Sequence, residues 1–157
     1  MLFLGKHDYS MDERGRVPMP PRYRDAFMQG VILTQGSPDR CVRAYPTNGF
    51  EAQAALYMSE PATTRSGRVR RRAFFSNAYP AELDKQGRVL VPQTLRDYAG
   101  LNNHIVVAGT GELIEIWNTP DYDAAVEQEE AEFIHDMGHD MGHDMGHDMG
   151  HDARSDA

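Results

Sequence analysis

The residues with the clearest chemical potential form a charged motif that occurs twice, at residues 12–24 and 84–96. Asp, Gly, Arg, Val, Pro and a final Arg recur at a constant offset of 72 residues. In each copy an aspartate stands four positions before an arginine, with glycine directly before the arginine. Such a carboxylate can pair with the guanidinium across a tight turn and hold it in one orientation. A guanidinium held in this way suits recognition of a repeated anionic polymer.

A purely structural role for the motif is the alternative. An exposed internal ion pair that only stabilises its own turn contributes about 0 to 1 kcal/mol. The whole unit is duplicated, and further matches such as Asp25 with Asp97 and Tyr45 with Trp117 extend the repeat over a complete folding unit. We therefore favour a functional motif.

The elements that would position the motif can be read from the surrounding residues. Glycine between charged residues suits a tight turn, and the Val-containing run after it favours an outgoing strand. Pro20 and Pro92 would end these strands and begin short helices at 21–27 and 93–99. Later strands are predicted near 31–33, 42–45, 105–108 and 113–117. Thr47 and Thr119 are predicted N-caps of the helices that follow.

The resulting β-β-α-β-β-α order in each repeat predicts a mainly β protein with short helices, of the α+β class. Each repeat has only about 45 residues, a size at which a separate core is marginal, so the repeats should share a core or assemble. We predict the following units: repeat 1 at 6–48, a helical Arg-rich connector at 49–77, repeat 2 at 78–121, a C-terminal helix at 122–134 and a disordered tail at 135–157.

Charge is divided unevenly along the chain. The net charge is −8 overall, but residues 121–157 contain twelve acids and only Arg154 as a cation. Residues 1–120 therefore carry a net charge of +3, and thirteen of their fifteen cations are arginine. Arginine pairs bidentately with phosphate and guanine, so the body favours a nucleic-acid partner.

The connector contains a helix-favouring run at 51–58 and, after Pro61, an arginine-rich run at 63–75. Helical spacing places Arg68, Arg71 and Arg72 away from the apolar face. They would belong either to a solvated helix packed on the core, which we favour, or to a patch that contacts phosphate.

The tail repeats His-Asp-Met-Gly four times and ends with a further His-Asp, at 135–152. Glycine at this period opposes helix formation by about 1 kcal/mol each relative to alanine. We predict a disordered acidic tail, and a metal site is the weaker alternative. Its candidate ligands are His135, His139, His143, His147 and His151.

Other chemistry is poorly supported. His7 and His104 are not matched between the repeats, and Cys41, the single cysteine, lies in an apolar run. No nucleophilic triad, zinc-protease or phosphate-loop motif occurs, so we predict no enzyme, catalytic residue, cofactor or small-molecule substrate. The chain lacks an apolar run that could span a membrane and a recognisable signal peptide, and a cytoplasmic location is expected.

The doubled Asp-x-x-Gly-Arg-Val-x-x-Pro-x-x-x-Arg motif, the opening Met-Leu-Phe-Leu-Gly and the Arg-rich stretch between the copies resemble the MraZ family of bacterial regulators, in the SpoVT-AbrB superfamily. The resemblance covers about residues 1–133. It implies two tandem swapped-hairpin AbrB-like units that form a pseudo-dimer within one chain, and assembly of chains into a closed ring. It also implies nucleoid-associated repression of the protein's own operon, a division and cell-wall gene cluster, through short G-rich direct repeats in double-stranded DNA.

Carried onto this sequence, the resemblance assigns DNA binding to the motif turns. We expect Arg16 and Arg88 at guanine edges and Arg14 and Lys85 on phosphates. The turns themselves would be oriented by Asp12, Gly15, Asp84 and Gly87. Arg14 replaces the family's usual lysine, and Gln86 stands at the equivalent position, so the two turns need not contact DNA equally.

Two rival functions stay open. An antitoxin-like or scaffold protein could use the same fold to hold a protein partner, and it would lack salt-dependent DNA affinity. A metal-handling protein centred on the tail would lose its function on deletion after Phe133, whereas a DNA-binding regulator would keep its DNA affinity.

Overall fold

The computed structural model describes the backbone of residues 2–155 and the side chains of residues 2–138. The chain divides into two compact units, residues 1–119 and 120–157. The first unit contains both motif copies and the connector, so the two repeats belong to one body, which agrees with the predicted need to share a core. The finer subdivision at residues 48, 77, 121 and 134 stays a prediction.

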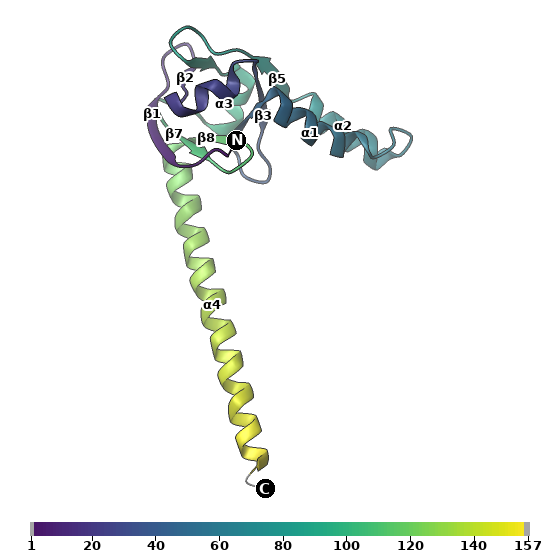
Figure 1. Cartoon of the computed structure of the whole chain (residues 1–157), viewed down its shortest axis with the longest axis vertical. Coiled ribbons are helices and arrows are strands. Elements are labelled where there is room, and N and C mark those ends of the chain that lie inside the picture. Colours follow the sequence, from purple (N-terminus) through teal and green to yellow (C-terminus); the bar gives the residue numbers. More distant parts are fainter. Residues whose placement is uncertain (1, 156–157) are drawn as a thin grey trace. The chain divides into compact units, whose positions relative to one another are not determined.

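The first unit is built around an antiparallel six-stranded sheet, shown in Figure 1, with strand order β1-β7-β8-β4-β3-β5. Three of its strands come from the first repeat and three from the second. Their bounds are β1 Lys6–Ser10, β3 Val31–Gln35, β4 Val42–Pro46, β5 Ala78–Ala81, β7 His104–Gly109 and β8 Ile114–Asn118. The α+β class predicted from the sequence is confirmed, and β3, β4, β7 and β8 fall on the predicted runs.

Strands pair across the repeat boundary. β1 of the first repeat pairs with β7 of the second, with Tyr9 opposite Ile105, while β5 of the second pairs with β3 of the first, with Ala81 opposite Val31. The central pair β4 and β8 also joins the two repeats. Because most of the neighbouring strands belong to different repeats, neither repeat can complete the sheet by itself.

A second, two-stranded sheet carries the motif. β2 Arg16–Pro18 pairs antiparallel with β6 Arg88–Leu90, so that Val17 lies opposite Val89, its own equivalent in the other repeat. Both valines are fully buried. The antiparallel register around two equivalent residues places the preceding turns in equivalent positions at the two ends of this ribbon.

Short helices follow the ribbon strands. Pro21–Phe27 is a 3₁₀-helix, η1, where the sequence predicts an ordinary helix, whereas Gln93–Ala99, α3, is the α-helix that was predicted. Phe27 and Leu95 from these helices join the buried core. Val17 and Val89 of the ribbon belong to the same buried cluster, so burial of apolar side chains fixes the ribbon on the rest of the unit.

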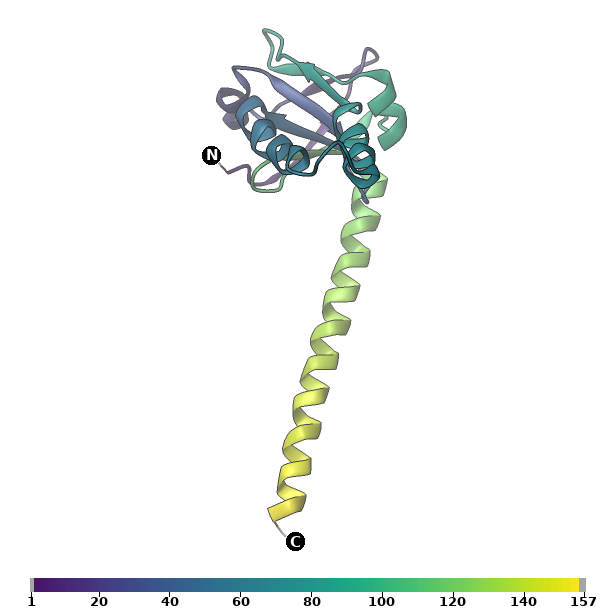
Figure 2. The same ribbon diagram turned by 90° about the vertical axis from the view of Figure 1, so that its right-hand side faces the viewer.

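The connector forms two α-helices, α1 Thr47–Met58 and α2 Arg65–Phe75, which lie side by side and extend from the sheet (Figures 1 and 2). Thr64 caps α2 by accepting a hydrogen bond from the Gly67 N–H at 3.0 Å. The prediction that Thr47 caps α1 is wrong: the N-cap is Pro46, and the Thr47 hydroxyl donates to the Gln29 carbonyl at 3.3 Å.

The second unit, from Pro120 onward, follows one α-helix, α4, whose bounds are Thr119–Ser155. Thr119 is its first residue, and the prediction that it caps the helix stays a prediction. The helix continues through the stretch from residue 135 onward, where we predict a disordered tail.

Candidate nucleic-acid interface

The first motif turn is organised by one carboxylate. Asp12 Oδ1 accepts hydrogen bonds from the backbone N–H of Arg14 at 3.0 Å and of Arg16 at 2.9 Å. Its other oxygen, Oδ2, accepts from Arg16 Nε at 2.6 Å. The same side chain therefore fixes the backbone of the turn and the direction of the arginine, as predicted from the spacing.

The second turn repeats this geometry. Asp84 Oδ1 accepts from the N–H groups of Gln86 and Arg88, each at 2.9 Å, and Oδ2 accepts from Arg88 Nε at 3.0 Å. The Asp-x-x-x-Arg spacing thus forms the same small frame in both repeats, and the predicted orienting role of the two aspartates has a geometric basis.

The two glycines of the motif are required by the backbone. Gly15 has φ +88° and Gly87 has φ +75°, a region that residues with a Cβ rarely adopt. Each N–H bonds back to the carbonyl of the aspartate three residues earlier, at 3.0 Å in both turns. Both glycines are buried although the turns around them face solvent.

Each turn is held by the opposite repeat. The Val91 N–H donates to the Gly15 carbonyl and the Met19 N–H donates to the Gly87 carbonyl, both at 2.9 Å. The final arginine of each motif covers the other glycine: a Cβ built on Gly15 would lie 2.5 Å from Arg96 Nε.

The matching contact joins Arg24 to Gly87, where an added Cβ would overlap the guanidinium. Arg24 Nε also donates to the Met19 carbonyl at 3.2 Å, and Arg96 Nε to the Val91 carbonyl at 2.9 Å. Arg24 and Arg96 recur at the constant offset, but the sequence alone predicts no role for them. Their recurrence at a constant offset could have indicated a role. The role itself, contact with the motif glycine of the other repeat, is visible only in the folded structure.

An ion pair connects the two frames. Arg88 Nη1 lies 3.7 Å from Asp12 Oδ2, the oxygen that also receives Arg16 Nε. Asp12, Arg16, Asp84 and Arg88 therefore form one contiguous cluster. The sequence pattern does not predict this contact, because its two partners are 76 positions apart.

Both aspartates are held as carboxylates. The backbone N–H of Arg16 is the main group that lowers the pKa of Asp12. The Arg16 guanidinium and the Arg14 N–H lower the pKa further, while desolvation raises it. The N–H of Arg88 likewise leads the lowering of the pKa of Asp84. A carboxyl group with a lowered pKa is a poor general acid, which agrees with a structural task for both side chains.

The tips of the turns carry the freely exposed cations. Arg14 and Lys85 are exposed, whereas Arg16 and Arg88 are only 31% and 26% exposed. All four predicted contact residues thus lie on the two turns, in two kinds of environment. The half-buried pair is held by carboxylates, and the outer pair takes part in none of the ion pairs among the described residues.

Most connector arginines are used within the hairpin. Arg71 donates from Nη2 to the carbonyls of Met58 and Glu60 at 2.9 and 2.8 Å, closing the turn between the helices. Arg68 donates to the carbonyls of Ala62 and Thr63, and Arg70 pairs with Glu60 at 2.6 Å. These contacts favour the packed, structural reading over a dedicated phosphate patch.

The residues considered for other chemistry lie apart. Cys41 is fully buried, and burial raises the pKa of its thiol to about 12. No group of three or more His, Cys, Asp or Glu side chains suited to a metal occurs among the described residues. His135 is exposed, while His139, His143, His147 and His151 lie outside the described side chains. Within the same described part, no helix has the length and apolar character needed to cross a membrane.

Comparison with known proteins links this geometry to a family. A family model described as "MraZ protein, putative antitoxin-like" matches residues 2–72 and 74–142. "Transcriptional regulator MraZ" of Thermobifida fusca is 38% identical over 139 residues, covering 87% of this chain and 96% of that protein. Proteins with the same name from Salinispora tropica and Deinococcus radiodurans are 36% and 39% identical, over 84% and 82% of this chain and 92% and 90% of theirs.

Proposed function

The chain belongs to the MraZ family, and from this premise we propose that it is a transcriptional regulator that binds double-stranded DNA sequence-specifically through its two motif turns. The observation that carries the proposal is the cluster of two carboxylate-held arginines with exposed cations beside them. We propose a regulatory role and no catalytic one.

The held arginines suit base recognition. Arg16 uses Nε to bind Asp12, and its terminal N–H groups make no other hydrogen bond among the described residues. A guanidinium with two terminal donors held in one plane can contact O6 and N7 of guanine together. Because Asp12 fixes the side chain before DNA arrives, little rotamer entropy is lost on binding. We assign base reading to Arg16 and Arg88.

The exposed cations suit phosphate contact. Arg14 and Lys85 lie at the tips and take part in none of the ion pairs among the residues that the structure describes. Phosphate contacts position a protein without selecting a sequence. Neutralising phosphates releases counterions, so these contacts should dominate the salt dependence of binding. Base reading is therefore assigned to the half-buried arginines, and phosphate contact to the exposed cations of the same turns.

The architecture supports a pseudo-dimer. Exchange of β1 and β5 between the repeats, together with the pairing of the equivalent residues Val17 and Val89, is what two swapped-hairpin AbrB-like units related by a local two-fold axis require. We propose this description of the first unit.

Assembly and target follow from the same proposal. A closed ring of chains presents one reading surface at successive positions, which suits direct repeats in DNA better than a palindrome. We propose that the protein, in the cytoplasm and at the nucleoid, represses its own operon and the division and cell-wall gene cluster by binding such repeats upstream.

The test compares two DNA fragments. Fluorescence anisotropy would measure the affinity of the full chain for labelled DNA from upstream of its gene and for random DNA of equal length, across a salt series. We expect tighter binding to the upstream fragment, a steep salt slope, and loss of the preference in Arg16→Ala/Arg88→Ala. Absence of binding to either DNA at low salt would overturn the proposal.

A second candidate is a protein-binding module, because the matching family description includes the word antitoxin. In that case the turns would hold a protein partner, and DNA affinity would be absent or independent of salt. A toxin gene beside this gene, and co-purification of its product in a complex resistant to the Arg16→Ala/Arg88→Ala change, would support this alternative.

A further inference from the structure

The two-stranded motif ribbon has an outer face on which one apolar side chain is still without a role. Side chains of a strand alternate between its two faces. Val17 of β2 and Val89 of β6 lie opposite each other and are fully buried. Their neighbours within the two strands therefore lie on the outer face of the ribbon, which consists of Arg16, Pro18, Arg88 and Leu90.

Leu90 is the exposed apolar residue of this outer face. It is 54% exposed, whereas Val89 and Val91 on either side of it are 0% exposed and belong to the core. The core is thus complete without Leu90. Across the ribbon Leu90 is the Cα partner of Arg16, and residues directly opposite in an antiparallel pair have Cβ atoms about 5 Å apart. An apolar side chain therefore stands beside one of the two held arginines.

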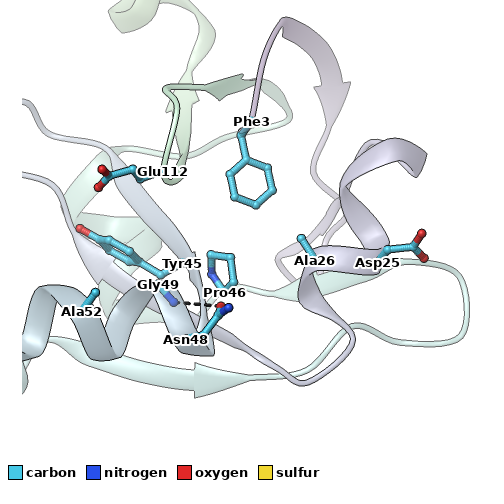
Figure 3. A pocket seen from close by; sticks show the side chains of 9 residues that line it. All are labelled: Phe3, Asp25, Ala26, Tyr45, Pro46, Asn48, Gly49, Ala52 and Glu112. Atoms are coloured by element: carbon cyan, nitrogen blue, oxygen red, sulfur yellow. Dashed lines mark hydrogen bonds between the residues drawn. The ribbon is translucent and has the colours of Figure 1, made fainter. Parts of the chain in front are cut away.

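The apolar residues around the pocket in Figure 3 are less accessible than Leu90. This pocket has a volume of about 520 Å³, and Phe3, Tyr45 and Pro46 among its lining residues are buried. The residues that line it all lie outside β2 and β6. Leu90 instead offers its apolar surface on the same face as Arg16 and Arg88, which the proposed function directs at DNA.

Thymine presents an apolar group that matches Leu90. In the major groove guanine offers the acceptors O6 and N7, whereas thymine offers O4 and its C5-methyl group. The groove is wide enough to admit a two-stranded β-ribbon. Successive bases lie about 3.4 Å apart along the axis, so two side chains that start about 5 Å apart can reach adjacent base pairs. The outer face therefore combines donors for guanine with an apolar contact for thymine.

We propose that Leu90 determines specificity by contacting the 5-methyl group of a thymine, in the base pair next to the guanine that Arg16 contacts. The inference rests on the proposed function and adds a thymine to the bases that the ribbon selects. At the other end of the outer face Pro18 lies opposite Arg88, and its ring is half-buried. The thymine contact is therefore assigned to the Leu90 end.

Deoxyuridine tests the contact from the side of the DNA. Replacing thymine by deoxyuridine removes the 5-methyl group and keeps the hydrogen-bonding groups of the base. The shortest upstream fragment that the native chain binds is prepared in a set, each member with one thymine replaced, and is titrated with the full chain by fluorescence anisotropy. At the contacted position the affinity should fall about fourfold, which corresponds to the burial of one methyl-sized group.

Substitution of Leu90 tests the contact from the side of the protein. Leu90→Ala should bind the unmodified fragment about fourfold more weakly and should no longer respond to deoxyuridine at the contacted position. The two changes remove the two sides of one contact, so their effects should not add. Leu90→Met keeps an apolar side chain of similar reach and should keep the response.

A leucine elsewhere on the surface provides the control. Leu56 in α1 is 67% exposed and lies outside the ribbon, so Leu56→Ala should respond to each deoxyuridine as the native chain does. Circular dichroism checks that all variants fold, and the deoxyuridine series on the native chain needs no variant at all.

The outcomes separate this inference from the proposed function. A native chain that prefers upstream DNA but responds to none of the deoxyuridines would overturn the thymine contact and leave the proposed function standing. A response that persists unchanged in Leu90→Ala would overturn the assignment to Leu90 in the same way. A native chain without any preference for the upstream fragment would overturn both.

Discussion

The two motif turns share a frame and differ at their tips. In the first turn Glu13 precedes Arg14, so the four charged residues of that turn cancel, while the second turn has Lys85 and the neutral Gln86 and keeps one net positive charge. Asp12 serves both Arg16 and Arg88, whereas Asp84 serves only Arg88. Both copies therefore hold their arginine in the same way, while the charge around it differs.

The shared frame predicts the largest effect at its glycines. Gly15→Ala should lower the free energy of unfolding by about 1 to 2 kcal/mol from positive φ alone, with an added cost because the new Cβ would lie 2.5 Å from Arg96 Nε. Gly111→Ala is the matched control, since Gly111 has φ +94° but no atom within 4 Å of an added Cβ. Chemical denaturation of both variants measures the difference in the free energy of unfolding. Equal losses of stability would contradict a steric role of Arg96 at Gly15.

The two aspartates contact different numbers of arginines, and this difference gives the next prediction. Asp12→Asn loses charge-assisted contacts with two arginines and Asp84→Asn with one, so Asp12→Asn should weaken specific DNA binding more. A loss of about 1 to 3 kcal/mol is expected for Asp12→Asn, in line with hydrogen bonds to charged groups. Anisotropy titrations with upstream DNA measure both variants. An equal or larger loss in Asp84→Asn would show that the contact between Arg88 and Asp12 carries no weight.

Acid should weaken the folded state through the same two carboxylates. Their folded pKa values lie below 3.8, so the unfolded chain binds protons first as the pH falls. This contribution to stability is complete above about pH 5 and decreases as the pH drops through 3.8 towards the folded pKa values. Denaturation curves of Asp12→Asn/Asp84→Asn should show a shallower decline over that range than the native chain. Parallel declines would contradict the assignment.

The tips should give the smallest effects. Lys85→Gln and Arg14→Gln each remove one exposed cation, so each should weaken specific and random DNA alike and reduce the salt slope by about 1. Lys85→Gln should have the larger effect, because no acid beside it in the turn offsets its charge, whereas Glu13 stands beside Arg14. Salt-dependent anisotropy of both variants checks this order. A change in base preference would place these residues at base edges.

Local sequence patterns predict the positions of helices and strands better than they predict which strands pair. Apolar runs and proline signals predicted β3, β4, β7, β8 and α3, because these features act over a few residues. The exchange of β1 and β5 between the repeats joins distant segments, and no local pattern encodes it.

The candidate site shows the same limit. The spacing of Asp12 and Arg16 predicted their pairing, since both lie in one turn. The ion pair between Arg88 and Asp12, and the cover of Gly15 by Arg96, depend on how the repeats combine. At the C-terminus the propensity of glycine favoured a disordered tail, and the structure instead has α4.

We propose that the held arginines read bases while the exposed cations bind phosphate. The most direct measurement is the ratio of affinities for upstream and random DNA, determined for the native chain, Arg16→Ala and Lys85→Ala at one salt concentration. We predict that Arg16→Ala loses roughly 1 to 3 kcal/mol on the upstream DNA and its ratio falls towards one, while Lys85→Ala keeps the native ratio. Equal losses on both DNAs for both variants would contradict the claim.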